Sequence, residues 1–223
     1  MKLIFTGHND RYAIEQDLLA FFPTERPVYD GDADETRCAW VKLSEGKIYT
    51  TATTRIVYDG REGRGLSRVR LPEDFTEYQK EGLRQRALKM SFFKAAVQVL
   101  GKVPVWGSLT GVRPGKLATR LMKSGQSPQQ AKKTLEKTYF VSPARARLCV
   151  EAAEAGRIAK EALDPNHISL YVGIPFCPTR CTYCSFVSYT SKRLLSLIPD
   201  YLTLLCAEIR RKFATIKALG LNV

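Results

Sequence analysis

The chain has 223 residues, of which 44% are hydrophobic and 10% aromatic, which is ordinary for one large or two small globular domains. No run of eighteen apolar residues occurs and the first residues soon turn polar. These features exclude a transmembrane helix and a signal peptide, so we expect a cytoplasmic protein with no membrane partner. The formal net charge is +13, from 35 Lys and Arg against 22 Asp and Glu.

The positive charge is concentrated in the middle of the chain. Residues 1–72 hold equal numbers of basic and acidic side chains, whereas residues 82–147 hold fourteen basic residues and one acid. Such a segment indicates an anionic partner, and the alternative is a solvated helix face.

Residues 1–72 are predicted to form an N-terminal α+β region. The short apolar run at residues 1–7 indicates a strand, and apolar side chains at helical spacing indicate a helix over 12–22. Two more strands are expected over 36–43 and 47–58, joined by a turn. The stretch GREGRGLSRVR at 60–70 lacks the Lys-Ser/Thr ending of a phosphate loop, and we interpret it as a connecting loop.

Residues 73–165 are predicted to form a basic helical region. A long amphipathic helix is expected over 75–101. A hydroxyl residue followed by proline, at Ser127-Pro128 and again at Ser142-Pro143, indicates the start of two further helices. The loop 106–114 precedes a basic helix, an arrangement that suits either anion binding at a helix N-terminus or a purely structural connection.

Three of the six cysteines are predicted to be buried thiols, because Cys38, Cys149 and Cys206 each stand alone among apolar residues. A disulfide framework is not expected in a cytoplasmic chain of this size.

The other three cysteines, Cys177, Cys181 and Cys184, form a Cys-x3-Cys-x2-Cys pattern directly after a predicted strand over 168–174. Three thiolates this close indicate a soft-metal centre on a loop. A structural zinc site is the alternative, but it usually needs four ligands. Three thiolates on a four-iron cluster leave one iron open, which S-adenosylmethionine (AdoMet) can chelate. The pattern therefore predicts a radical AdoMet (radical SAM) site with a [4Fe–4S] cluster.

The segment YVGIPFCPTRCTYCSF, residues 171–186, resembles the cluster segment of oxygen-independent coproporphyrinogen III oxidases (dehydrogenases) of the radical SAM superfamily. The motif LTGVRP at 109–114 is similar to one in the N-terminal extension of the HemZ-like subgroup. The chain departs from the better-studied branch at Gly173, where that branch has His, and at Phe186, where it has a fourth Cys.

By this resemblance, Cys177, Cys181 and Cys184 would ligate the [4Fe–4S] cluster. Tyr171 would contact AdoMet, and Tyr183 would lie against its adenine. No catalytic residue is assigned.

The resemblance also implies an oxidoreductase of haem biosynthesis that decarboxylates two propionates of coproporphyrinogen III to vinyl groups, giving protoporphyrinogen IX. Its electron donor would be of the flavodoxin or ferredoxin type. A tetracarboxylate porphyrinogen substrate suits the basic middle region, where Arg113, Lys116 and Arg120 are candidate carboxylate partners.

Two other functions remain open. One is a radical SAM enzyme that modifies RNA, whose binding would weaken steeply with salt, although a nucleic acid is not the expected partner. The other is a haem-binding relative without oxidase activity.

The expected fold class is α/β: the α+β region, the helical middle, and residues 166–223 as the first β/α unit of a radical SAM partial (β/α) barrel, with a helix over 194–219. A full (β/α)8 barrel takes about 250 residues. We therefore expect this radical SAM domain to be truncated, and the chain to be inactive by itself.

Overall fold

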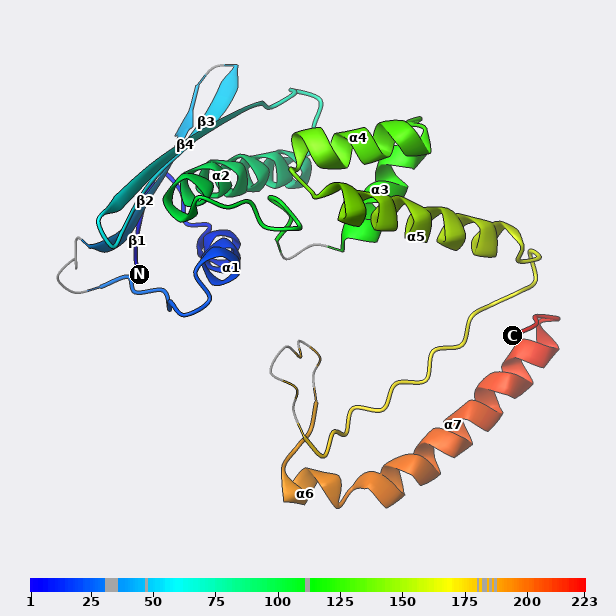
Figure 1. Ribbon diagram of the computed structural model, residues 1–223. Coiled ribbons are helices and arrows are strands. Elements are labelled where there is room, and N and C mark those ends of the chain that lie inside the picture. The colour runs from blue at the N-terminus through cyan, green and yellow to red at the C-terminus, as the bar shows by residue number, and fades with distance from the viewer. Residues whose placement is uncertain are drawn as a thin grey trace. The chain divides into compact units, whose positions relative to one another are not determined.

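The structure, a computed structural model, describes residues 1–30, 36–46, 48–110, 113–179, 181, 184, 186 and 188–223 (Figure 1). It divides into two units, Met1–Gly156 and Arg157–Val223, called here the first and the second unit. Within the described residues the fold is mixed α/β, with four strands and seven helices. The division of the chain into three regions remains a prediction.

The first unit contains a four-stranded sheet in the order β1-β2-β3-β4. β1 pairs in parallel with β2, and the other two neighbouring pairs are antiparallel. The strands are β1 (Lys2–Thr6), β2 (Arg37–Glu45), β3 (Tyr49–Tyr58) and β4 (Arg61–Arg70). The first three agree with the sequence prediction within a few residues.

β4 corrects the interpretation of residues 60–70 as a loop. Gly63 and Gly65 lie inside this strand and face a helix so closely that an added Cβ would lie 2.2 and 1.8 Å from backbone oxygens of that helix. Glycine within a strand can mark such a close backbone approach as well as a turn.

Two helices, α1 (Arg11–Phe21) and α2 (Glu77–Leu100), share one hydrophobic core with the sheet. α2 begins with a capping box between Thr76 and Gln79 and ends at Gly101, which has φ 66°. These caps satisfy backbone groups that the helix ends leave free. The core side chains alternate along the strands and recur at helical spacing; they include Ile14, Leu18, Val41, Ile56, Leu88 and Phe92.

A second core joins α3 (Pro114–Lys123), α4 (Pro128–Thr138) and α5 (Pro143–Glu161). The two predicted helix starts are confirmed, and Ser127 forms a capping box with Gln130. The loop before α3 packs tightly, because a Cβ on Gly107 would lie 2.0 Å from the carbonyl oxygen of Tyr139.

The second unit contains the short helix α6 (Lys192–Leu195) and the long helix α7 (Ile198–Ala218). The strand predicted over 168–174 is wrong. In the described part of this unit, only isolated pairings of His167 with Asn222 and of Phe176 with Tyr189 occur. Apolar β-forming residues make a strand only where a neighbour completes their backbone hydrogen bonds, and the described residues provide none here. A radical SAM barrel is not shown.

None of the helices in the described ranges is long and apolar enough to cross a membrane.

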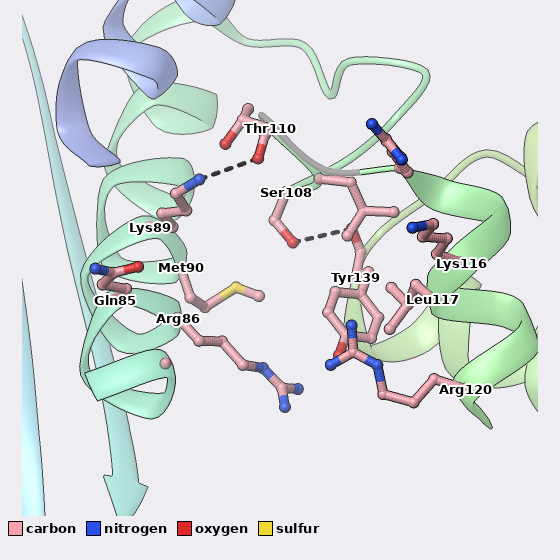
Figure 2. Close-up of a pocket in the computed structure, with 13 residues that line it drawn as sticks. Gln85, Arg86, Lys89, Met90, Ser108, Thr110, Lys116, Leu117, Arg120 and Tyr139 are labelled. Atoms are coloured by element: carbon pink, nitrogen blue, oxygen red, sulfur yellow. Dashed lines mark hydrogen bonds between the residues drawn. The ribbon is translucent and has the colours of Figure 1, made fainter. Parts of the chain in front are cut away.

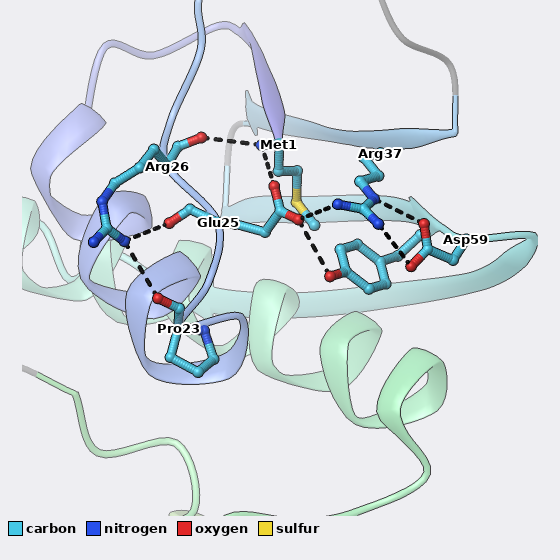
Figure 3. Close-up of polar contacts among 7 residues, drawn as sticks. Met1, Pro23, Glu25, Arg26, Arg37 and Asp59 are labelled. Carbon is cyan, nitrogen blue, oxygen red and sulfur yellow. Dashed lines mark hydrogen bonds and ion pairs between the residues drawn. The ribbon is translucent and has the colours of Figure 1, made fainter.

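Glu25 is the centre of a polar network at the edge of the first core (Figure 3). Its carboxylate accepts hydrogen bonds from the amino group of Met1 at 2.6 Å, from Arg37 at 3.0 Å and from the hydroxyl of Tyr58 at 3.2 Å. Arg37 also pairs with Asp59 at 2.7 Å. The bond from the amino group, with help from Tyr58 and Arg37, holds the pKa of Glu25 below its ordinary value.

We expect Glu25→Gln to lower the free energy of unfolding at neutral pH by about 1–2 kcal/mol, since hydrogen bonds to a largely buried charged group are lost. A depressed carboxyl pKa contributes stability above its unfolded value of 4.5, and this is lost as the pH falls through the folded value. The difference should therefore shrink below about pH 4.5. Urea unfolding followed by circular dichroism at several pH values tests this, with Glu73→Gln, at an exposed carboxylate of the same unit, as a control that should change little.

Candidate functional site

The cysteine loop of the second unit is closed at its base by backbone hydrogen bonds. The amide of Cys177 donates to the carbonyl of Tyr189 at 3.1 Å, and the amide of Tyr189 donates to the carbonyl of Pro175 at 2.8 Å. The backbone on either side of the cysteine loop is therefore held together by these two hydrogen bonds.

Aromatic side chains tie the base of this loop to α7. The ring of Phe176 lies edge-on to the ring of Tyr201, with centroids 5.0 Å apart, and tilts against Tyr189 at 5.9 Å. The hydroxyl of Tyr201 donates to the carbonyl oxygen of Gly173 at 2.5 Å. These contacts fix the chain just before the first cysteine to the helix that follows the loop.

The three motif cysteines are accessible thiols. Cys181 is exposed, whereas Cys177 and Cys184 are partly buried. The amide of Cys184 donates to the carbonyl of Cys181 at 3.0 Å, so the backbones of the last two cysteines lie close together. Among the described residues, however, no three His, Cys, Asp or Glu side chains are grouped closely enough to hold a metal ion.

The three motif cysteines are nevertheless the type of ligand that binds an iron–sulfur cluster. Three soft thiols come from one closed loop, and none is sealed in the core, so a cluster could enter without opening the fold. The thiols would have to turn toward one another on binding. Of the two predicted AdoMet contacts, Tyr171 is 87% exposed, and Tyr183 lies outside the described residues.

The isolated cysteines follow their predicted burial in two cases out of three. Cys38 and Cys149 are buried, and burial raises the pKa of the Cys149 thiol. Cys206 is exposed on α7, which has no buried side chain in the described structure. The prediction for Cys206 is therefore wrong, because no described part of the chain buries the apolar residues around it.

A second feature, the basic pocket, is a cavity of about 420 Å³ in the first unit, between α2 and α3. Figure 2 shows Arg86 and Arg120 extending toward each other from these two helices. Five cationic side chains line the cavity: Arg86, Lys89, Arg113, Lys116 and Arg120. The structure thus brings the three predicted carboxylate partners together and adds two more from α2.

The N-terminus of α3 adds to the positive potential of the basic pocket. Arg113 occupies the N-cap position and makes no side-chain cap hydrogen bond, and the first turn of the helix has no acid. The amide groups of that turn carry the positive end of the helix dipole.

A hydrogen-bond chain that leads to a buried carboxylate holds Lys89 at the wall of the pocket. The ammonium of Lys89 donates to the carbonyl of Thr110 at 3.0 Å, and the hydroxyl of Thr110 donates to Asp17. Asp17 is only 1% exposed, and its Oδ2 has no hydrogen-bond partner among the described residues. Burial raises the pKa of Asp17 to about 7, against the lowering effects of Thr110 and Lys89.

Sequence reasoning missed Arg86, Lys89 and Asp17. Positions 86 and 89 are three apart, so they lie on one helix face, and this was the available signal. Asp17 stands beside the apolar positions 14 and 18 of α1, where an acid is unusual.

No family model matches the chain. The oxygen-independent coproporphyrinogen-III oxidase-like protein HemZ of Bacillus subtilis (strain 168) is 35% identical over 108 residues, which is 48% of this chain and 22% of that protein. The chain thus spans only about a fifth of that relative. Protein VC0702 from Vibrio cholerae, a crystal structure, matches 72% of this chain and 98% of its own at 15% identity and a TM-score of 0.22, too weak to inform the fold.

About half of this chain is therefore similar to HemZ, which agrees with the HemZ-like resemblance noted in the sequence.

Proposed function

We propose that this chain carries the cluster-binding segment of a radical SAM oxidoreductase that converts coproporphyrinogen III to protoporphyrinogen IX. The observation that carries the proposal is the closed, accessible loop holding Cys177, Cys181 and Cys184 at Cys-x3-Cys-x2-Cys spacing. The similarity to HemZ supports the same class of reaction.

In this proposal the three motif cysteines hold the cluster, and Tyr171 contacts AdoMet. When bound, a [4Fe–4S] cluster with one open iron and AdoMet supplies one-electron chemistry that starts from the sulfonium of AdoMet. Arg113, Lys116 and Arg120 bind substrate carboxylates as charge-assisted hydrogen-bond donors. The electron donor is a flavodoxin or ferredoxin.

Anaerobic reconstitution of the chain with iron and sulfide tests the cluster site. We expect the absorbance and the iron and sulfide content of one [4Fe–4S] cluster per chain, and a change in the electron paramagnetic resonance spectrum of the reduced cluster when AdoMet is added. Cys177→Ser, Cys181→Ser and Cys184→Ser should each lose most of the bound iron, because a three-thiolate site has no spare ligand.

Cys206→Ser is the matched control, since Cys206 is an exposed thiol of the same unit outside the motif. It should retain the cluster. Equal iron in the control and in all three motif variants would overturn the assignment, as would a cluster whose spectrum ignores AdoMet.

A further inference from the structure

The basic pocket concentrates positive charge around one cavity. Five cations line it and no carboxylate does, and within the described structure none of the five forms an ion pair with an acid. Other cations of the first unit do: Arg84 pairs with Glu45 and Glu77, and Lys132 pairs with Glu136. Like charges held around one cavity repel one another, so an anion that enters relieves this repulsion.

The pocket also has an apolar wall. Met90 from α2, Leu109 from the loop and Leu117 from α3 line it together with the ring of Tyr139. The guanidinium of Arg86 lies 4.9 Å from the centre of that ring, which fixes one cation beside a flat apolar surface. A simple inorganic anion could pair with the cations but would make no contact with this apolar wall.

The volume of about 420 Å³ lies within the range of roughly 300–1,000 Å³ that small-molecule sites occupy. We propose that the basic pocket is a binding site for an organic polyanion, a molecule with several carboxylates on an apolar body. The charges come from two helices on opposite sides of the cavity (Figure 2), so a molecule with several anionic groups can contact both sides.

This inference deepens the proposed function, on which it rests for the choice of a polycarboxylate. It places recognition of the acidic groups in the first unit, whose residues need neither the cluster nor AdoMet to bind. The two proposals can therefore fail separately.

Fluorescence titration of the full chain with coproporphyrin III, in air and without added iron, tests the pocket. We expect saturable binding of one tetracarboxylate per chain, weaker binding of the dicarboxylate protoporphyrin IX and none of the tetramethyl ester. Arg86→Gln and Arg120→Gln, one on each side of the cavity, should each weaken binding about tenfold, as expected for the loss of a charge-assisted contact.

Lys123→Gln is the matched control, because Lys123 is an exposed cation of α3 that does not line the cavity. It should change the affinity less than twofold, and circular dichroism should show that all three variants keep the fold. A loss of affinity in Lys123→Gln equal to that of the pocket variants would overturn the proposal in favour of general charge attraction. Binding of the uncharged ester would overturn it in favour of apolar contact without recognition of carboxylates. If ATP binds more tightly than coproporphyrin III and the pocket variants weaken its binding, the pocket selects phosphates, and the assignment of a polycarboxylate is overturned.

Discussion

Replacing Gly65 in β4 by alanine is expected to lower the free energy of unfolding of the first unit by about 3 kcal/mol or more. A Cβ at this position would lie 1.8 Å from the backbone oxygen of Ser91 in α2 and 2.9 Å from the backbone nitrogen of Ala95. Helix backbone atoms cannot move aside one at a time, so α2 would have to shift away from the sheet. That shift would also disturb the buried hydrogen bond between Thr54 and Ser91 hydroxyls, 2.7 Å long.

Urea unfolding followed by circular dichroism measures this loss. Gly82→Ala is the matched control, because Gly82 lies in α2 itself with nothing within 4 Å of its added Cβ. Alanine there should stabilise the helix by about 0.5–1 kcal/mol. An unchanged unfolding midpoint for Gly65→Ala would show that α2 lies farther from β4 than this structure has it.

The contact between β4 and α2 matters for the proposed site because α2 carries two of the five pocket cations. Arg86 and Lys89 lie within about a turn and a half before Ser91, whose backbone oxygen a Cβ added at Gly65 would meet. A shift of α2 would change the distance across the cavity to Arg120. The same variant should therefore weaken polyanion binding as well as stability, even though Gly65 does not line the pocket.

The sequence predicts an element well where apolar residues recur at regular spacing over many positions and where capping residues mark its ends. α2 has both, with its apolar stripe, the capping box at Thr76 and the left-handed Gly101. β4 escaped prediction because Gly63 and Gly65 read as turn residues, and only the position of α2 explains them. Residues 168–174 show the opposite error, since β propensity does not make a strand without a pairing partner.

The cysteine motif and the basic pocket also differ in how far the sequence alone could predict them. Cys177, Cys181 and Cys184 are neighbours in sequence, so their pattern is visible without a fold. The basic pocket joins residues from α2, the loop at 108–110 and α3, and sequence alone pointed only to the part on α3. Its link to Asp17 in α1 depends on a contact across ninety-three positions of the chain.

Replacing Asp17 by asparagine is expected to stabilise the chain above neutral pH and to have little effect near pH 4. The folded pKa of about 7 exceeds the unfolded value of 3.8, so the folded state holds a proton that the unfolded state releases. Wild-type stability therefore falls as the pH rises from about 4 to about 7, and the penalty stays constant above that. A shift of this size corresponds to roughly 4 kcal/mol as an upper limit.

Asparagine can still accept the hydrogen bond from Thr110 but carries no charge, so it should escape this penalty. We expect Asp17→Asn to be more stable than the wild type by about 2–4 kcal/mol at pH 8, measured by urea unfolding across the pH range. Asp74→Asn, at an exposed position, is the control and should follow the wild type at every pH. If Asp17→Asn is instead less stable at pH 8, the charged carboxylate is compensated in the fold, and attraction to Lys89 outweighs the cost of burial.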